Sequence, residues 1–256
     1  MAIGRTVFSQ LMDFVSMQEF HVCVDRYAGH YKVKSFSCWD QFLCMVFAHL
    51  THRESLRDIE ASLRAVSNKL YHSGRRGKIS RNTLANANRT RDWRIFRDVA
   101  QGLIAEARTL YRDDSLAMDL EGTVYALDST TIDLCLSLFP WAPFERSKAA
   151  VKLHTLLDLH GSIPTLCVIT HGRVNDVKIL DQLVFEPGAY YVLDRGYLDY
   201  ARLYRIHQSG AWFVTRTDAN TAMRRLYSRP VDKQTGVLID QLVVLSIKRS
   251  RHRYPE

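Results

Sequence analysis

The sequence predicts an α+β protein in which a helical N-terminal domain precedes a mixed β-sheet flanked by helices. Up to Tyr111 the apolar residues recur mainly at intervals of three and four, the period of helices that bury one face. Beyond the turn at Asp113 and Asp114, short apolar runs of strand length alternate with helical patterns. We therefore expect a helical domain, a sheet domain and the start of a β-rich segment over residues 1–115, 116–218 and 219–256.

In the helical part, apolar spacing predicts helices over Thr6–Ser16 and Gln18–Tyr27. Ser37 is a suitable cap for an apolar helix that extends to Leu50. Thr51 and Glu54 have the spacing of a capping box, which predicts the start of the next helix. A long helix from Asp92 to Tyr111 would complete this domain.

The second part predicts strands joined by helices and turns. Two strands are expected at the start, and a third strand is followed by a run that extends or pairs with it. Helices then separate two further short strands, and a β-hairpin follows. In order, these segments are Thr123–Leu127, Ile132–Leu138, Ala150–Leu159 with Ile163–Thr170, the helix Asp176–Val184, Tyr190–Leu193, the helix Leu198–Gln208, Trp212–Thr215, and the hairpin strands Thr221–Tyr227 and Val237–Ser246.

The 256 residues are 46% hydrophobic, which is enough to build a core. The apolar run Phe42–Ala48 is far shorter than the roughly 20 residues of a membrane span, and the N-terminus has no apolar signal core, so we expect a cytoplasmic protein without a membrane partner. The five cysteines are scattered and form no Cys-x-x-Cys pair, a pattern typical of reduced core thiols rather than a zinc site.

Basic residues outnumber acidic ones by 35 to 27, and the net charge of +8 favours a polyanionic partner over a merely solvated surface. Between Gly74 and Arg97 only Asp92 opposes a cluster of seven arginines and one lysine. Ser80 can cap a helix there with a polar face, which weakly indicates a helix-turn-helix; ordinary surface arginines are the alternative. The DNA-binding candidates in this segment are Arg75, Arg76, Lys78, Arg81, Arg89 and Arg91.

Two of the apolar runs end in a carboxylate, at Asp128 and at Asp194. If their strands are neighbours, the two acids converge at the carboxyl edge of the sheet, where they would select a hard cation such as Mg²⁺ or Mn²⁺. Two such ions could promote phosphodiester chemistry. Each aspartate could instead serve a turn or a helix cap. Asp133 is a weaker candidate.

The histidines at positions 154, 160 and 171 fit no compact metal-ligand spacing. We therefore interpret His154, His160 and His171 as loop or strand-surface residues.

Three segments follow one another in a recognisable order: Leu127-Asp-Ser-Thr-Thr-Ile-Asp-Leu134, Lys148-Ala-Ala-Val-Lys-Leu-His154 and Leu193-Asp-Arg-Gly-Tyr197. In these segments the sequence resembles the insertion-sequence-four family of bacterial DDE transposases. Phe8-Ser-Gln-Leu, Trp39-Asp-Gln-Phe and Ser55-Leu-Arg-Asp-Ile59 are similar to the N-terminal domain found in a branch of that family.

The resemblance implies a ribonuclease-H-like core and metal-dependent cut-and-paste DNA transposition. Asp128 and Asp194 would be the first two acids, both catalytic and both ligands of Mg²⁺ or Mn²⁺, with two ions in the complete site. Arg195 and Lys152 would contact DNA. The implied partners are the terminal inverted repeats of the element and target DNA, with a homodimer assembled on them, nucleoid-associated in the cytoplasm.

One departure from the family pattern concerns its third acid, a glutamate in a helix that also carries Tyr, Arg and Lys. After Glu186 the chain has no glutamate except Glu256, and no tyrosine after Asp194 has an arginine three residues later. We expect a C-terminally truncated transposase that is inactive alone. The alternatives are a non-catalytic DNA-binding fragment that occupies element ends or inhibits full-length transposase, a metal-dependent nuclease of the same fold, and an unstable product.

Overall fold

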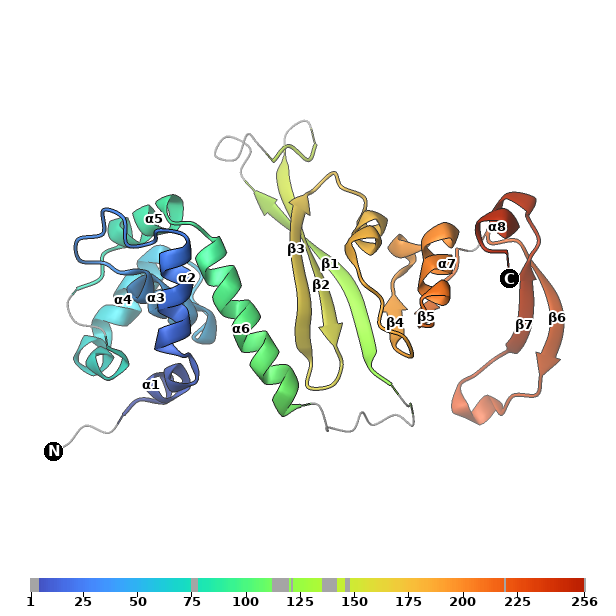
Figure 1. Ribbon diagram of the computed structural model, residues 1–256, viewed down its shortest axis with the longest axis horizontal. Coiled ribbons are helices and arrows are strands. Elements are labelled where there is room, and N and C mark those ends of the chain that lie inside the picture. Colours follow the sequence, from blue (N-terminus) through green and yellow to red (C-terminus); the bar gives the residue numbers. More distant parts are fainter. Residues whose placement is uncertain are drawn as a thin grey trace. The chain divides into compact units, whose positions relative to one another are not determined.

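The computed structural model describes residues 5–74, 78–111, 120, 122–134, 142–145, 148–218 and 220–255. The chain forms two compact units, Met1–Ala107 and Arg108–Glu256 (Figure 1). Among the described residues, no helix combines the length and the apolar content needed to cross a membrane.

The N-terminal unit is helical, as the sequence predicts. Ser37 and Asp40 form a reciprocal capping box at the start of α3, and Ser80 caps α5 by accepting a hydrogen bond from the Thr83 amide. The helices are α1 (Val7–Leu11), α2 (Met17–Arg26), α3 (Cys38–Leu50), α4 (Leu56–Ala65), α5 (Arg81–Thr90) and α6 (Arg94–Leu110), with 3-10 turns at Met12–Phe14 and Ser67–Ser73.

The predicted capping box at Thr51 and Glu54 is wrong. The cap of α4 is Ser55, whose hydroxyl accepts a hydrogen bond from the Asp58 amide. Thr51 instead closes α3, because its hydroxyl donates to the Phe47 carbonyl at 2.7 Å. A Ser/Thr side chain satisfies whichever helix end lies beside it, so the spacing pattern alone selected the wrong end.

Two apolar clusters hold this unit together. One packs Phe20 and Val24 of α2 against Ile95 and Val99 of α6. The other joins α3, α4 and α5 through residues that include Leu84, which is fully buried. Because α3 contributes to both clusters, it forms the centre of the helical unit.

The second unit is built on a five-stranded mixed sheet of order β3-β2-β1-β4-β5. β1 pairs antiparallel with β2 and parallel with β4, β2 pairs antiparallel with β3, and β4 pairs parallel with β5. With its flanking helices this is the predicted ribonuclease-H-like arrangement. The strands are β1 (Val124–Leu134), β2 (Ala149–Asp158), β3 (Ile163–His171), β4 (Tyr190–Leu193) and β5 (Trp212–Thr215).

The two strands predicted at the start of this unit are one continuous strand. β1 runs through the hydroxyl residues after Asp128 because β2 pairs with it without interruption from Tyr125 to Leu134. The predicted extension to Leu138 lies outside the described residues. The run from Ile163 onward is a separate strand that pairs with β2, as one of the two expected arrangements has it.

The helical elements cover one face of the sheet. The segment Asp176–Gln182, predicted as an α-helix, is a 3-10 helix capped by Asn175. Its Ile179 and Leu180 pack with Leu203 and Ile206 of α7 (Tyr200–Gln208) against apolar side chains of β1 and β4.

The expected hairpin forms a separate two-stranded sheet of β6 (Met223–Arg229) and β7 (Asp240–Leu245), and α8 (Lys248–Arg253) follows it. Tyr254 connects this segment to the core, because its hydroxyl lies 3.0 Å from Nδ1 of His207 and its ring packs edge-on against Phe213.

Candidate functional site

The structure places Asp128 and Asp194 on neighbouring parallel strands. The parallel pairing of β1 with β4 ends at the pair Leu127 and Leu193, and each aspartate is the next residue of its chain. β4 stops there, whereas β1 continues along β2. Asp128, within β1, and Asp194, just after β4, therefore lie at the same end of the paired segment, and both residues are exposed.

Each carboxylate has a close polar contact. The Asp128 carboxylate accepts a hydrogen bond of 2.7 Å from the amide of Ser129. Asp194 forms an ion pair with Arg216, which follows β5, and the pKa of Asp194 is lowered mainly by this hydrogen bond. Arg195 contacts Asp218 at 3.4 Å. Cationic side chains from the ends of β4 and β5 thus surround the second acid.

An open cavity of about 480 Å³ lies beside Asp194. Its wall comes from the residues that follow β4 and β5, so it opens at the carboxyl edge of the parallel strands. The lining residues are Asp194, Arg195, Gly196, Arg216, Thr217 and Asp218.

Tyr197 brings a buried polar group close to both acids. The residue is 2% exposed, and its hydroxyl has no partner at hydrogen-bonding geometry among the described residues. Burial raises the pKa of Tyr197 to about 12, and the charges of Asp176, Asp128 and Asp194 act in the same direction, while the nearby Ser129 opposes them. Three carboxylates therefore share the surroundings of this phenol.

Lys152 lies on β2 but points to an internal acceptor. Its ammonium donates to the carbonyl of Val174 at 3.1 Å and to Asp176 at 2.9 Å, and its side chain is only 15% exposed. A contact of this lysine with DNA would require it to leave these partners. Asp176 is also 3.9 Å from Nδ1 of His154.

His154 differs from the prediction of a surface or loop residue. It is 1% exposed, its Nε2 lies 2.9 Å from the Thr170 hydroxyl, and burial lowers its pKa. His160 meets the expectation better, since it lies in the turn after β2, 3.3 Å from Asp158.

Within the described residues, no group of three or more His, Cys, Asp or Glu side chains is arranged to hold a metal ion. The two exposed carboxylates supply hard oxygen donors that suit Mg²⁺ or Mn²⁺. The donor chemistry of Asp128 and Asp194 therefore fits a divalent cation.

Comparison with known proteins decides the family. Residues 119–256, more than half of the chain, match the family described as "Transposase DDE domain". The chain belongs to the DDE transposase family. The resemblance to insertion-sequence-four transposases predicted from the motifs is thereby confirmed, and residues 3–76 match a domain of unknown function, DUF4372.

Two curated relatives carry transposase names. The chain is 29% identical over 175 residues to a putative transposase, y4zB, of Sinorhizobium fredii (strain NBRC 101917 / NGR234), covering 67% of this chain and 48% of that protein. It is 31% identical over 127 residues to a probable transposase for insertion sequence element IS5377 of Geobacillus stearothermophilus, covering 49% of this chain and 33% of that protein. The chain spans about half or less of the length of these relatives.

In this DDE transposase chain the basic residues of the N-terminal unit have different surroundings. Arg75 and Arg76 lie outside the described residues. Lys78 and Arg89 are exposed, and Arg89 also donates to the side chain of Asn86 at 3.2 Å. Arg81 is half-buried and extends over Asn82. These three cations lie on or just before α5.

Arg91 has an internal structural role. Its guanidinium donates to the carbonyls of Phe36 and Ser37 and to the side chain of Gln41. Burial lowers its pKa. This arginine ties the end of α5 to the start of α3, which makes its predicted contact with DNA secondary to its role in the fold.

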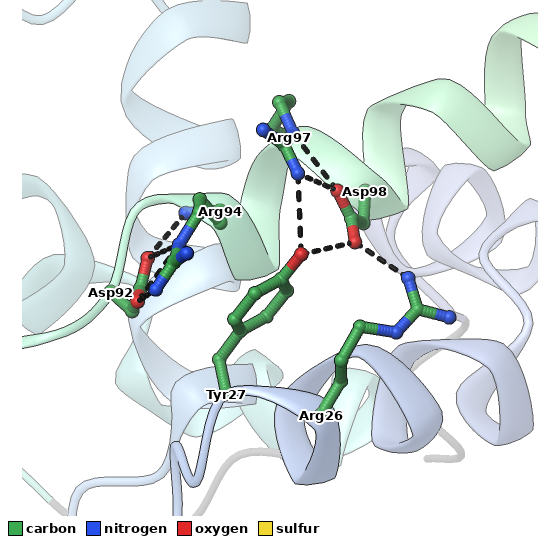
Figure 2. Close-up of polar contacts among 6 residues, drawn as sticks. All are labelled: Arg26, Tyr27, Asp92, Arg94, Arg97 and Asp98. Carbon is green, nitrogen blue, oxygen red and sulfur yellow. Dashed lines mark hydrogen bonds and ion pairs between the residues drawn. The ribbon is translucent and has the colours of Figure 1, made fainter.

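Two more arginines of the basic segment are paired within the fold (Figure 2). Arg94 forms a bidentate contact with Asp92, and Arg97 donates to Asp98 at 2.7 Å. Asp98 also accepts from Tyr27 and from Arg26, and these hydrogen bonds, led by that from Arg97, lower its pKa to about 2. Much of the local charge is therefore neutralised by ion pairs.

The sequence-based search missed Asp176, Arg216 and Asp218. Arg216 and Asp218 could have been found, because they directly follow a predicted strand at the edge that carries Asp194. Asp176 had no such signal, since its proximity to Lys152 depends on how the segment after β3 folds back on the sheet.

Proposed function

We propose that the chain contributes the first two acids of a metal-dependent DNA transposase, which cuts and joins phosphodiesters at the ends of an insertion sequence. The observation that supports the proposal is the parallel register of β1 with β4, which ends at Leu127 and Leu193, one residue before Asp128 and Asp194. The DDE transposase match covers both residues.

In the proposed site, Asp128 and Asp194 would ligate Mg²⁺ or Mn²⁺. Two such ions, when bound, activate a water or hydroxyl nucleophile and stabilise the leaving oxygen of the phosphodiester. The amide of Ser129 holds one oxygen of Asp128 in place. Arg195 and Arg216, which line the cavity beside Asp194, supply positive charge for a DNA phosphate.

We further propose that this chain alone does not cleave DNA, because two carboxylates hold a pair of cations poorly without a third. A strand-cleavage assay with Mn²⁺ on duplex DNA that carries element ends tests this. We expect no turnover by the purified chain. Turnover that disappears in Asp128→Ala would show that the two acids suffice.

The second candidate function is DNA binding without catalysis, in which the N-terminal unit occupies element ends or inhibits a full-length transposase. Exposed Lys78 and Arg89 beside the polar face of α5 favour it. Gel-shift titration against terminal inverted repeats tests this candidate. Binding that survives neutralisation of Arg75, Arg76 and Arg89 would rule out this segment as the contact surface.

The partners proposed for either function are the inverted repeats and target DNA, on which two copies of the chain would assemble. A net charge of +8 gives long-range attraction to such a polyanion. The proposed location is the cytoplasm, on the nucleoid when DNA is bound. Size measurement of the chain with and without element-end DNA would detect the assembly.

A further inference from the structure

A cavity of about 600 Å³ opens in the N-terminal unit between the loop after α2 and one side of α5. The loop contributes residues 27–29 and 31–36, which include Lys32 and Lys34, and the helix contributes polar side chains one turn apart. The helix residues that line it are Thr83, Asn86, Ala87 and Thr90.

The near end of this loop is fixed by close packing at Gly29. A Cβ atom there would lie 2.7 Å from Cδ1 of Ile95 and 2.9 Å from both Sγ of Cys38 and Cγ1 of Val24. The Gly29 amide also donates to the Val24 carbonyl at 2.8 Å. The backbone at Gly29 is therefore packed directly against the core, and this packing fixes where the loop begins after α2.

Arg91 fixes the far end through the carbonyls of Phe36 and Ser37. Ala28, directly before the fixed Gly29, and Lys32, between the two ends, adopt left-handed backbone conformations with φ of 50° and 56°. Non-glycine residues rarely adopt this conformation, and it costs about 1 kcal/mol or more at each position. The loop thus holds a defined shape, although most of its residues are outside the core.

The charge of the cavity is positive. Lys32 and Lys34 are exposed, and neither forms an ion pair with a carboxylate among the described residues. Arg91 lies at the lining, and the one acidic lining residue, Asp92, is neutralised by Arg94. Hydroxyl and amide groups of α5 form the opposite wall, so the cavity offers cations on one side and neutral hydrogen-bonding groups on the other.

We propose that this cavity binds the sugar-phosphate backbone of duplex DNA, with Lys32 and Lys34 contacting phosphates. The inference rests on the proposed DNA-binding function and specifies the surface that carries it. Duplex DNA fits because Asn86 lines the cavity and Asn82 and Arg89 are exposed on the same helix, and amide and guanidinium groups are the side chains that read base edges. One DNA strand would lie against the loop that carries Lys32 and Lys34, while α5 faces a groove of the DNA.

The test compares two double variants with the same loss of charge. Lys32→Gln with Lys34→Gln removes the two exposed lysines of the cavity, whereas Arg57→Gln with Lys69→Gln removes two exposed cations elsewhere in the same unit. Binding of a fluorescently labelled mixed-sequence duplex is followed by anisotropy over a series of salt concentrations. Circular dichroism melting checks that each variant folds like the parent chain.

We expect the cavity variant to bind on the order of tenfold more weakly and to lose about two units from the slope of log affinity against log salt. The control pair should keep nearly the parental slope, and Lys32→Arg with Lys34→Arg should retain binding. Equal losses in both neutralised pairs, or unchanged binding of the cavity variant, would overturn the proposal.

Failure of the cavity can be separated from failure of the proposed function. If the parent chain binds the duplex and the Lys32→Gln/Lys34→Gln variant binds it equally well, the DNA-binding function stands and the cavity is not the contact surface. If the parent chain does not bind the mixed-sequence duplex at all, the cavity proposal is refuted, and the gel shift with element ends then decides whether the DNA-binding function stands.

Discussion

Asp194, the residue after β4, forms an ion pair with Arg216, the residue after β5. The positive charge of the Arg216 guanidinium would repel a cation bound by Asp194, and its hydrogen bond and charge lower the pKa of the Asp194 carboxylate. In the proposed site, Arg216 would thus compete with a metal ion for Asp194 while keeping this carboxylate ionised. This relationship leads to a prediction about metal affinity.

Replacing Arg216 with Gln should raise the affinity for Mn²⁺ by roughly threefold to tenfold, because one repelling charge is removed from an exposed site. The pKa of Asp194 should rise toward the ordinary carboxyl value, so the variant should lose Mn²⁺ at a higher pH than the parent as the pH falls. Calorimetric titrations at several pH values measure both effects. Arg229→Gln, which removes the partner of Asp240, is the matched control. Weaker Mn²⁺ binding in Arg216→Gln would contradict the competition.

The pair of Lys152 and Asp176 should stabilise the sheet domain. Changing Lys152 to Met removes the cation that pairs with Asp176, whose side chain is only 25% exposed. We expect this change to lower the free energy of unfolding by about 1–3 kcal/mol. Adding Asp176→Asn should restore part of that loss. Urea denaturation measures the stability. An unchanged urea midpoint in Lys152→Met would show that the pair contributes nothing to stability. If the variant instead shows a smaller salt dependence of DNA affinity than the parent chain, Lys152 contacts DNA.

Asp98 should make the helical unit sensitive to acid. Its pKa in the folded chain is about 2, below the value of about 4 in an unfolded chain, so its stabilising effect is complete above pH 4 and is lost as the pH falls toward 2. Asp98→Asn should therefore lower stability at pH 7 by about 1 kcal/mol, with a smaller difference at pH 3. Thermal melts at both pH values test this. A difference that grows on acidification would have the wrong sign.

Gly29 should tolerate no side chain. In Gly29→Ala the new Cβ must displace Ile95, Cys38 and Val24, all of which are buried, and overpacking of this kind costs about 1–3 kcal/mol. Gly236→Ala on the hairpin meets no atom within 4 Å but carries a φ of +84°, so it separates backbone strain from steric overlap. If chemical denaturation shows the two variants equally stable, packing at Gly29 is not the determining factor.

Much of the fold was predictable because its signals are local. The caps at Ser37 and Ser80 and the strand Tyr190–Leu193 follow from side chains within a few residues. The single strand β1 was not predictable, since Asp128-Ser-Thr-Thr favours a turn and only the backbone of β2 keeps it extended.

The surroundings of the site residues depend on long-range contacts that no spacing pattern reveals. Arg91 belongs to a basic run, yet its partners lie at Phe36 and Ser37, far away in the sequence. Asp194 could be placed at a strand end, but its pairing with Arg216 requires the parallel register of β4 with β5. Sequence reasoning therefore singled out the two aspartates that are proposed as metal ligands, but it did not identify their electrostatic neighbours.

The most direct test of the account is Mn²⁺ titration of the full chain and of three single variants, with free Mn²⁺ measured by electron paramagnetic resonance. Asp128→Asn and Asp194→Asn should each abolish or strongly weaken binding. Asp133→Asn removes the same charge from the same strand as Asp128 and should bind like the parent chain. Equal Mn²⁺ binding by the parent chain, Asp128→Asn and Asp194→Asn would contradict the assignment of these two aspartates as the metal-binding pair.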